Sequence, residues 1–375
     1  MRIALTLLSG VGYGGQTYFR NLLPALLATD RHNAYHCFVQ EAHPLIRELA
    51  APNLFFHAVL RSRATAMERF HFEQIQLPRH LRRIKADLLY TAKNLTVFRA
   101  PCAQMIAIRN MEPFRYRAFA NTWSHRAQSR LRWELTKRSL ARADAIICVS
   151  RAVRDAVTEI FPAAEQKIQV IYNGNPVHHT ERTPIPQPFL LTASKFVPYA
   201  NQLTLVEAYG QLVAARPNTP PLWFAGGVHD ARYFRRVQQR VTELQLTNHI
   251  RFLGLVSQAQ LHALMRDARA FLFPSMVEAC PHTLIEAMGC GAPIATTTVP
   301  PMPEICADAA IYCDPRDALG MATTIARLLD EDQLRAQLVA AGKIQAATFT
   351  WDRTARALVA AFTAYSAPAH RMVHG

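Results

Sequence analysis

Two glutamates, Glu278 and Glu286, stand where an apolar run at 270–273 gives way to a helix-like segment. The run ends at Pro274, so the pattern predicts a strand, a loop with Glu278 and a helix whose first turns carry Glu286. Backbone N–H groups at a helix start lack partners within the helix, and together with the helix dipole they favour a bound anion such as phosphate. Carboxylates accept hydrogen bonds from sugar hydroxyls but repel phosphate. We therefore expect a ligand with phosphate in its middle and hydroxyls at both ends, as in a nucleotide-sugar.

Apolar runs alternate with helix-like segments along the chain, which is typical of parallel sheets with helices on both faces. In the first half the expected strands lie at 2–8, 35–39, 54–60, 87–90, 105–108, 145–149 and 168–172. A segment rich in Pro, Thr and His at 175–188 is the expected linker. Strands then follow at 189–193, 222–225, 250–253, 270–273, 293–297 and 310–313, with a last helix at 351–365. Ligands bind outside the carboxyl ends of strands in such sheets, so the loop after 270–273 is the expected site.

The first expected strand is followed by a glycine-rich stretch at 10–15, which predicts a tight turn before a helix at 17–27. Gly10, Gly12 and Gly15 match the spacing of a dinucleotide-binding turn. Glu41 lies somewhat beyond the distance of about 20 residues expected of a ribose-binding acid. An NAD-dependent dehydrogenase therefore remains an alternative. In the other interpretation, the glycines only permit a tight turn or let the backbone approach a ligand closely.

The charge of the chain is concentrated in its first half. Residues 1–180 carry 25 Lys and Arg against 12 Asp and Glu, and hold +13 of the net charge of +15. The densest runs, 61–85 and 115–142, interleave bases with aromatic and aliphatic residues. Two interpretations fit them: solvated helix faces, and contact with anionic lipid headgroups or a phosphorylated acceptor. No nucleic-acid-binding module accompanies the charge, so no nucleic-acid partner is expected.

Length and cysteine usage limit the class of protein. At 375 residues the chain is long enough for two domains of roughly 150 to 200 residues each. The seven cysteines are scattered, which favours reduced packing cysteines over disulfides or a zinc site. No apolar run approaches the roughly 18 residues of a membrane span, and 1–10 is typical of a buried strand rather than a signal peptide. We expect a cytoplasmic protein, either free or peripheral on the inner face of the plasma membrane.

From its glycine-rich loop to its last helix, the chain resembles the retaining glycosyltransferases of family 4. The most specific match is Glu278 and Glu286 with seven residues between them, followed by AMGCGAP at 287–293 and PEI at 303–305. Supporting matches are ADAIICVS at 143–150, VIYNG at 170–174 and PYANQ at 198–202. The resemblance implies the GT-B fold, an α/β architecture of two Rossmann-like, doubly wound parallel-sheet domains facing across a cleft. It assigns 1–175 to an acceptor-binding domain and 176–354 to a nucleotide-sugar-binding domain, with a C-terminal helix at about 355–375 crossing back to the first.

The resemblance also implies roles for single positions. Glu278 would contact hydroxyls of the donor sugar, and Glu286 the ribose hydroxyls. The diphosphate would lie against the backbone of four residues, Cys280, Pro281, His282 and Thr283. Lys195 stands where the family places a cation on that diphosphate, and Gly14 with Gly15 would let the first domain close over it.

Three positions depart from the family pattern. Ala279-Cys280-Pro281 replaces a glycine-aromatic-glycine run and reshapes the expected sugar pocket. Ala200 replaces a lysine. Arg109 stands where many members carry a histidine, and it can bind a phosphate or a sugar hydroxyl but cannot act as a base. Glu278, Lys195 and Arg109 are the expected catalytic residues.

The implied activity is transfer of a hexose from a UDP- or GDP-linked donor to a saccharide or lipid-linked glycan, in cell-surface polysaccharide or lipopolysaccharide synthesis. The transfer would retain the anomeric configuration, with no metal and no cofactor, because a lysine and backbone dipoles stabilise the leaving diphosphate. A catalytically silent nucleotide-sugar or glycan-binding protein of the same fold is the alternative.

Overall fold

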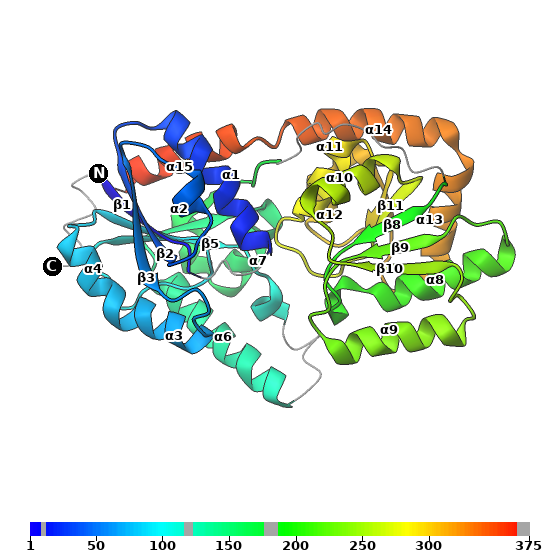
Figure 1. The fold of residues 1–375 in the computed structure, drawn as a ribbon, viewed down its shortest axis with the longest axis horizontal. Helices are drawn as coiled ribbons and strands as arrows, with labels where there is room; N and C mark the ends of the chain where they lie inside the picture. Colours follow the sequence, from blue (N-terminus) through cyan, green and yellow to red (C-terminus); the bar gives the residue numbers. More distant parts are fainter. Residues whose placement is uncertain (9–12, 116–122, 176–186, 366–375) are drawn as a thin grey trace. The chain divides into compact units, whose positions relative to one another are not determined.

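The computed structural model describes residues 1–8, 13–115, 123–175 and 187–365, and for 13–16, 124 and 125 it describes the backbone alone. The chain divides into two compact units: unit 1 comprises Met1–Gly174 and the chain from Thr350 on, and unit 2 comprises Asn175–Phe349. Each unit is built around one parallel sheet with helices on both faces (Figure 1). The predicted α/β class with two doubly wound parallel sheets is therefore confirmed.

The sheet of unit 1 has seven strands in the order β3-β2-β1-β4-β5-β6-β7, and neighbouring strands are parallel throughout. The central strands are short and almost wholly buried, as expected of strands covered on both faces. The strands are β1 (Arg2–Thr6), β2 (Ala34–Gln40), β3 (Leu54–Leu60), β4 (Leu88–Thr91), β5 (Ala103–Ile108), β6 (Ala145–Cys148) and β7 (Ile168–Val170).

The larger core of unit 1 lies between the sheet, α1 (Tyr13–Thr29) and the last helix, α15 (Trp351–Ala364). Tyr18 of α1 meets Trp351 edge to face with ring centroids 5.6 Å apart, and Thr354 donates to the Tyr172 carbonyl at 2.8 Å. Gly174 is required for this approach, because a Cβ there would lie 2.3 Å from the Trp351 nitrogen. The last helix thus belongs to the first domain, as the resemblance implied.

The start of α1 corrects one prediction. Gly14 and Gly15 were expected in a turn before a helix at 17–27, but they form part of the first turn of α1, which begins at Tyr13. Glycine costs about 1 kcal/mol in a helix. Burial of Tyr18, Phe19 and the leucines that follow on the same face offsets this. Gly10 and Gly12, and with them the predicted dinucleotide pattern, lie outside the described residues.

A second core of unit 1 lies on the opposite face, where Phe72, Leu77 and Leu81 pack against the sheet. Phe72 opens a π-helical turn (Phe72–Gln76) that joins two α-helices. The loop after β4 holds this turn, since Gln74 donates to the Thr96 carbonyl at 3.0 Å. The remaining helices of unit 1 are α2 (Leu45–Glu48), α3 (Ala66–His71), α4 (Leu77–Arg83), α6 (Trp123–Arg142) and α7 (Arg151–Ile160), with 3₁₀ turns at Glu112–Arg115 and Pro162–Lys167.

Unit 2 repeats the arrangement with six parallel strands in the order β10-β9-β8-β11-β12-β13. They are β8 (Leu190–Ala193), β9 (Leu222–Ala225), β10 (Ile250–Gly254), β11 (Ala270–Phe273), β12 (Ile294–Thr297) and β13 (Ala310–Cys313). The helices are α8 (Gln202–Ala215), α9 (Ala231–Glu243), α10 (Gln258–Asp267), α11 (His282–Cys290), α12 (Met302–Cys306), α13 (Ala318–Asp330) and α14 (Asp332–Ala347), with 3₁₀ turns at Pro198–Ala200 and Ala307–Ala309.

Helices α8, α9 and α13 lie on one face of this sheet, and α10, α11 and α14 on the other (Figure 1). An aromatic cluster lies on the first face, where Phe234 of α9 meets Phe196 and Phe252 with centroids 4.6 and 5.4 Å away. Gly226, at the end of β9, has φ +151°, and a Cβ there would lie 1.9 Å from the Ser194 carbonyl oxygen. Glycine therefore lets this strand end close against the loop that follows β8.

Candidate functional site

The candidate site of unit 2 lies where the direction of strand order changes. From β8 the chain proceeds to β9 and β10 on one side, and from β11 to β12 and β13 on the other, although β8 and β11 are hydrogen-bonded neighbours. Both strands are parallel, so the loops after Ala193 and after Phe273 leave the same edge. Ligands of open α/β sheets bind at this kind of switch point.

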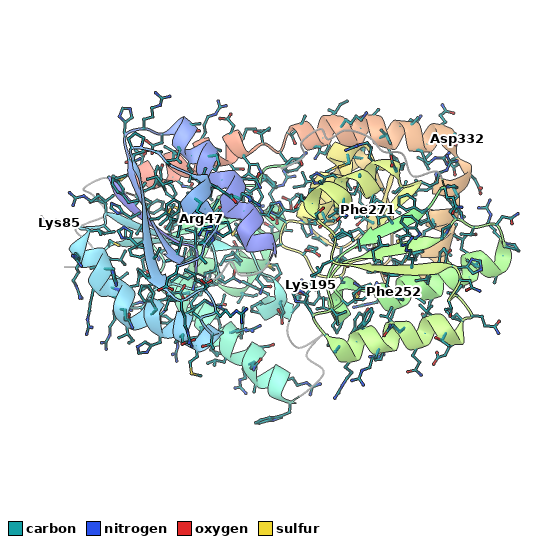
Figure 2. All side chains as sticks on the ribbon, in the orientation of Figure 1. Arg47, Lys85, Lys195, Phe252, Phe271 and Asp332 are labelled. Carbon is teal, nitrogen blue, oxygen red and sulfur yellow. The ribbon has the colours of Figure 1, made fainter. Side chains whose placement is uncertain are left out.

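The loop after β8 carries Lys195 (Figure 2). This loop continues the pairing with the chain after β9, because the Ser194 amide donates to Ala225 at 3.0 Å and the Phe196 amide to Gly227 at 2.9 Å. The Lys195 side chain is exposed, and its Nζ lies 5.2 Å from the centroid of the Tyr199 ring. The loop therefore holds the Lys195 backbone at the sheet edge, while the charged side chain is exposed.

Glu278, in the loop after β11, is half-buried and held by a hydrogen bond from a buried serine. Ser275, which is 1% exposed, donates from Oγ to Glu278 Oε1 at 2.9 Å. Burial raises the pKa of the Glu278 carboxyl to about 7, while the Ser275 hydrogen bond and the positive charge of Lys195 act in the opposite direction. The sequence placed Glu278 and Lys195 in one site, and the structure brings them to the same edge. Ser275 was missed, although a serine three residues before a buried carboxylate is a usable signal.

A polar frame holds the two loops together. Asn201 adopts the left-handed conformation, with φ 63°, and its Nδ2 donates to the carbonyls of Pro274 at 3.1 Å and Pro315 at 2.7 Å. The Met276 amide donates to the Tyr199 carbonyl at 2.8 Å. Ala200, where the family carries a lysine, is buried at 3% exposure. The PYANQ motif therefore acts as a structural clamp across the switch point.

Glu286 lies within α11 and is 5% exposed. Gln258, at the start of α10, donates from Nε2 to Glu286 Oε1 at 2.8 Å and lies 3.0 Å from His262 Nε2. Burial raises the pKa of Glu286 to about 7, and the Gln258 hydrogen bond lowers it only in part. Glu286 is the fifth residue of the helix and lies beyond its first turn, so helix-dipole stabilisation does not account for the carboxyl there. Gln258 was missed because it lies 28 residues away in the chain.

Helix α11 begins at the predicted anion site. Its N-cap residue, Pro281, makes no side-chain capping bond, and the Leu284 amide donates to the Pro281 carbonyl at 3.0 Å. Cys280 and Pro281 are buried, whereas His282 and Thr283 are half-buried. An uncapped helix start between Glu278 and Glu286 has the polarity that phosphate prefers.

The other predicted site residues belong to unit 1. Gly14 and Gly15 contribute backbone to the first turn of α1. Arg109 follows β5 directly, and its guanidinium carbon lies 3.7 Å from the centroid of the Tyr18 ring.

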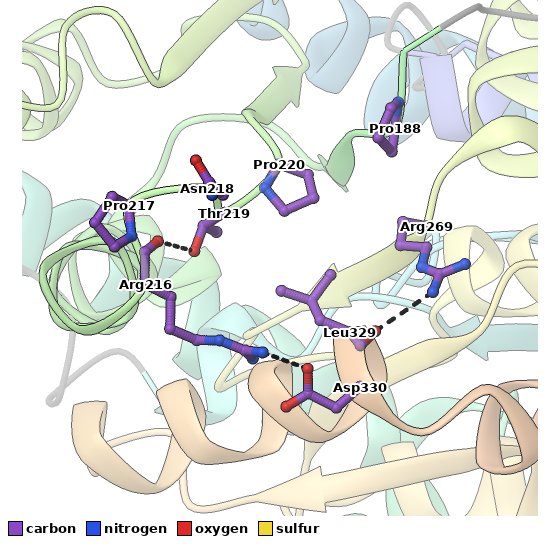
Figure 3. Close-up of a pocket in the computed structure, with 9 residues that line it drawn as sticks. All are labelled: Pro188, Arg216, Pro217, Asn218, Thr219, Pro220, Arg269, Leu329 and Asp330. Atoms are coloured by element: carbon purple, nitrogen blue, oxygen red, sulfur yellow. Dashed lines mark hydrogen bonds and ion pairs between the residues drawn. The ribbon is translucent and has the colours of Figure 1, made fainter.

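A cavity of about 660 Å³ lies elsewhere in unit 2 (Figure 3). Its lining includes Pro188, Pro220 and Arg269, which precede β8, β9 and β11 and so mark the amino-terminal edge of the sheet. Arg216 pairs with Asp330, and Arg269 donates to the Leu329 carbonyl at 3.4 Å. Because these groups brace the end of α13 at the edge opposite Glu278, the cavity is not the predicted donor site.

Among residues 1–8, 13–115, 123–175 and 187–365, no group of three or more His, Cys, Asp or Glu side chains is placed to hold a metal ion. No helix in these ranges is long and apolar enough to cross a membrane.

Two family models match consecutive parts of the sequence. The model described as Glycosyltransferase Family 4 matches residues 13–177, and the one described as Glycosyl transferases group 1 matches residues 178–345. The chain belongs to the family 4 glycosyltransferases. This membership favours a glycosyltransferase over the dehydrogenase alternative.

Similar proteins include relatives and solved structures. The O-antigen chain mannosyltransferase B of Escherichia coli is 28% identical over 209 residues, which are 55% of this chain and 50% of that protein. This chain thus spans about half the length of that curated relative. The sucrose-phosphate synthase of Thermosynechococcus elongatus has a TM-score of 0.76 at 19% identity, over 97% of this chain and 98% of the other. Anabaena HepE, solved with UDP and glucose, has a TM-score of 0.73 at 18% identity, over 97% and 100%. The structural likenesses establish the GT-B fold.

Replacement of Glu286 by glutamine should change how the stability of this family 4 protein depends on pH. Since the folded pKa of Glu286 is raised from 4.5 to about 7, its protonated form stabilises the fold fully below about pH 4.5, and this contribution is lost as the pH rises through about 7. Glutamine stays neutral, so Glu286→Gln should gain about 2 to 3 kcal/mol relative to wild type between about pH 4.5 and about pH 8.

Denaturant unfolding of the full chain at about pH 4.5 and about pH 8 gives the free energies of unfolding whose difference is predicted. Glu243→Gln, on the surface of α9, serves as the matched control and should show no comparable change. An equal difference between wild type and Glu286→Gln at both pH values would contradict burial of a titrating carboxyl.

Proposed function

We propose that unit 2 binds a nucleoside-diphosphate sugar and that the protein transfers its hexose to a saccharide or lipid-linked glycan. The observation that carries the proposal is the pair Glu278 and Glu286, held on either side of the uncapped start of α11 with Lys195 at the same sheet edge. Two carboxyls with an anion-binding helix start between them match the hydroxyl, phosphate and hydroxyl order of such a donor.

Each group has one task in this proposal. Glu286 receives the ribose hydroxyls, with Gln258 fixing its Oε1. Glu278, supported by Ser275, receives hydroxyls of the hexose. Lys195 and the start of α11 stabilise negative charge on the diphosphate as the glycosidic bond breaks, an electrostatic contribution that is usually large when the groups are fixed in advance. These groups supply positive charge without a metal, so we propose metal-independent transfer.

Retention of the anomeric configuration completes the mechanism. The acceptor hydroxyl attacks from the face that the diphosphate leaves, and an oxygen of the leaving phosphate takes the acceptor proton. The carbon–oxygen bond to the diphosphate breaks with its electron pair, and a bond to the acceptor oxygen forms on the same face. Glu278 and Lys195 touch donor groups in this scheme and act by positioning and charge.

The nature of the substrates rests on the relatives. The similar E. coli protein is named as an O-antigen chain mannosyltransferase, and HepE was solved with UDP and glucose. We therefore propose a UDP- or GDP-linked hexose as donor and a cell-surface polysaccharide or lipopolysaccharide glycan as acceptor. A silent binding protein is the second candidate, favoured by two departures from the family pattern, Arg109 and Ala200.

We also propose that unit 1 binds an anionic membrane surface on the cytoplasmic side. Five exposed apolar residues support this: Met67 at 81%, Phe70 at 39%, Ile75 at 49%, Trp123 at 85% and Leu131 at 61% exposure. They lie on α3, the π-helical turn and α6, which we name the basic–apolar surface.

The elements of the basic–apolar surface meet at one loop. Gln74 of the π-helical turn donates to the Thr96 carbonyl, and the Thr96 amide donates to Ser139 of α6 at 3.1 Å. Residues 61–85 carry seven bases and two acids, and α6 carries six bases and one acid. Bases contribute about 1 kcal/mol each near an anionic surface, while the apolar side chains enter the interface. Their combination favours a bilayer over a purely polyanionic partner.

Nucleotide titration tests the donor site. Above about pH 7, where the Glu286 carboxyl is ionised, Glu286→Gln should weaken nucleoside diphosphate binding about tenfold or more, because a charged acceptor for the ribose hydroxyls is lost. Lys195→Met should weaken the binding of a nucleoside diphosphate but leave the affinity for the nucleoside unchanged. In this proposal the lysine contacts only the phosphate groups of the ligand. Calorimetric titration of UDP, GDP and the nucleosides, with Glu243→Gln as control, measures both effects. The proposal fails if no nucleoside diphosphate binds, or if Glu286→Gln binds as wild type does.

Vesicle binding tests the membrane proposal. The double substitution of Trp123 and Leu131 by serine should lower recovery on phosphatidylglycerol vesicles at low salt by roughly tenfold, because apolar area no longer enters the interface. Leu319→Ser, an equally exposed apolar position on unit 2, is the matched control. Salt should weaken wild-type binding. Equal recovery of the wild type on neutral and anionic vesicles at low salt would exclude the proposal.

A further inference from the structure

Arg109 stands at the carboxyl edge of the sheet of unit 1. It follows β5 at the point where that strand, beside β4, leaves the sheet. Asn94, in the loop after β4, fixes its backbone: Asn94 Oδ1 accepts from the amides of Arg109 at 3.0 Å and Asn110 at 3.3 Å, and Asn94 Nδ2 donates to the Asn110 carbonyl at 2.6 Å. The origin of the Arg109 side chain is therefore set by two loops at once.

The guanidinium of Arg109 lies over an aromatic ring. Its carbon lies 3.7 Å from the centroid of Tyr18, whose hydroxyl lies 2.6 Å from the hydroxyl of Tyr90. Trp351 in turn meets the Tyr18 ring edge to face. The charge of Arg109 opposes the rise in the pKa of the Tyr18 hydroxyl that burial causes, which agrees with its close approach. The contact with the ring and the fixed backbone together restrict the movement of the guanidinium.

Arg109 has no counter-ion among the residues that the structure describes. The residue is half-buried, and its Nε is buried without a hydrogen-bond partner in the described chain. The neighbouring cation is different: Lys93, after β4, forms an ion pair with Glu73, which is 2% exposed. Of these two cations at adjacent strand ends, Lys93 is paired with a carboxylate, and Arg109 is not paired with one in the described chain.

A partly desolvated guanidinium without a carboxylate is unfavourable unless an anion joins it. The aromatic ring compensates only part of the lost hydration. The planar fork of arginine matches the oxygens of phosphate in a bidentate arrangement, and a ring that restricts its rotation reduces the entropy lost on binding. These properties describe a phosphate site.

We propose that Arg109 binds a phosphate group of the acceptor and thereby makes the enzyme select phosphate-bearing acceptors over neutral glycans. This inference rests on the proposed function and adds a substrate class to it. The phosphate has two candidate sources, a lipid-linked diphosphate and a phosphorylated sugar, which share the group that Arg109 recognises. Arg109 is a specificity-determining residue in this account, and the diphosphate of the donor is bound by unit 2.

Titration of the full chain, already saturated with the nucleoside diphosphate that binds unit 2, isolates the acceptor phosphate. The probes are farnesyl diphosphate for the lipid source, glucose 6-phosphate for the sugar source, and methyl glucoside as the uncharged comparison. Arg109→Gln should weaken the better-bound phosphate probe at least about tenfold and leave nucleotide affinity unchanged. Arg109→Lys keeps the charge but loses the bidentate fork, so its affinity for the phosphate probe should lie between those of the wild type and Arg109→Gln. It also provides a second variant if Arg109→Gln unfolds.

Arg251→Gln is the matched control, because Arg251 also stacks on an aromatic ring, 5.4 Å from the centroid of Trp223 in unit 2. It should leave the affinity for both phosphate probes unchanged. Binding of neither probe by the wild type, or equal phosphate affinity in the wild type and in both Arg109 variants, would overturn the inference. Failure of every nucleoside diphosphate to bind would refute the proposed function instead, so the two outcomes are distinguishable.

Discussion

Parallel pairing of β8 with β11 is the constraint on which the candidate donor site depends. It brings the loop with Lys195 and the loop with Glu278 to one edge, although 82 residues separate the two positions in the chain. Asn201 then joins the second loop to the one after β13 through two carbonyls. Loss of this pairing would leave no shared edge at which a carboxyl and a cation meet.

Burial gives the two carboxyls their chemical character. Each has a pKa raised to about 7 and one hydrogen-bond donor on Oε1, Ser275 for Glu278 and Gln258 for Glu286. A desolvated carboxyl held in this way is ready to accept hydrogen bonds from a ligand, and its interaction with a hydroxyl is stronger than it would be in water. The fold loses some stability at neutral pH in exchange, as is common where function requires a buried polar group.

Sequence reasoning predicted the strands of unit 2 well because most of them are short apolar runs between helix-like segments, such as the run at 270–273 that Pro274 ends. It also placed Glu278 in the loop and Glu286 in the helix that follows, because both placements depend on the local sequence. It could not find Gln258, because the contact with Glu286 depends on how α10 packs against α11. The start of α1 was misplaced because Gly14 and Gly15 disfavour a helix locally, whereas packing of the turns that follow decides the outcome. The stack of Arg109 on Tyr18 likewise joins residues from different strands and helices.

The most direct test of the account is a transfer assay in the presence of a metal chelator, with a panel of UDP- and GDP-linked hexoses and both phosphorylated and neutral glycan acceptors. Proton magnetic resonance of the product gives the configuration at the transferred anomeric carbon. The account predicts transfer from at least one donor with the configuration of the donor retained and with chelator present. Inversion at that carbon, or activity that appears only when a divalent metal is restored, would contradict it.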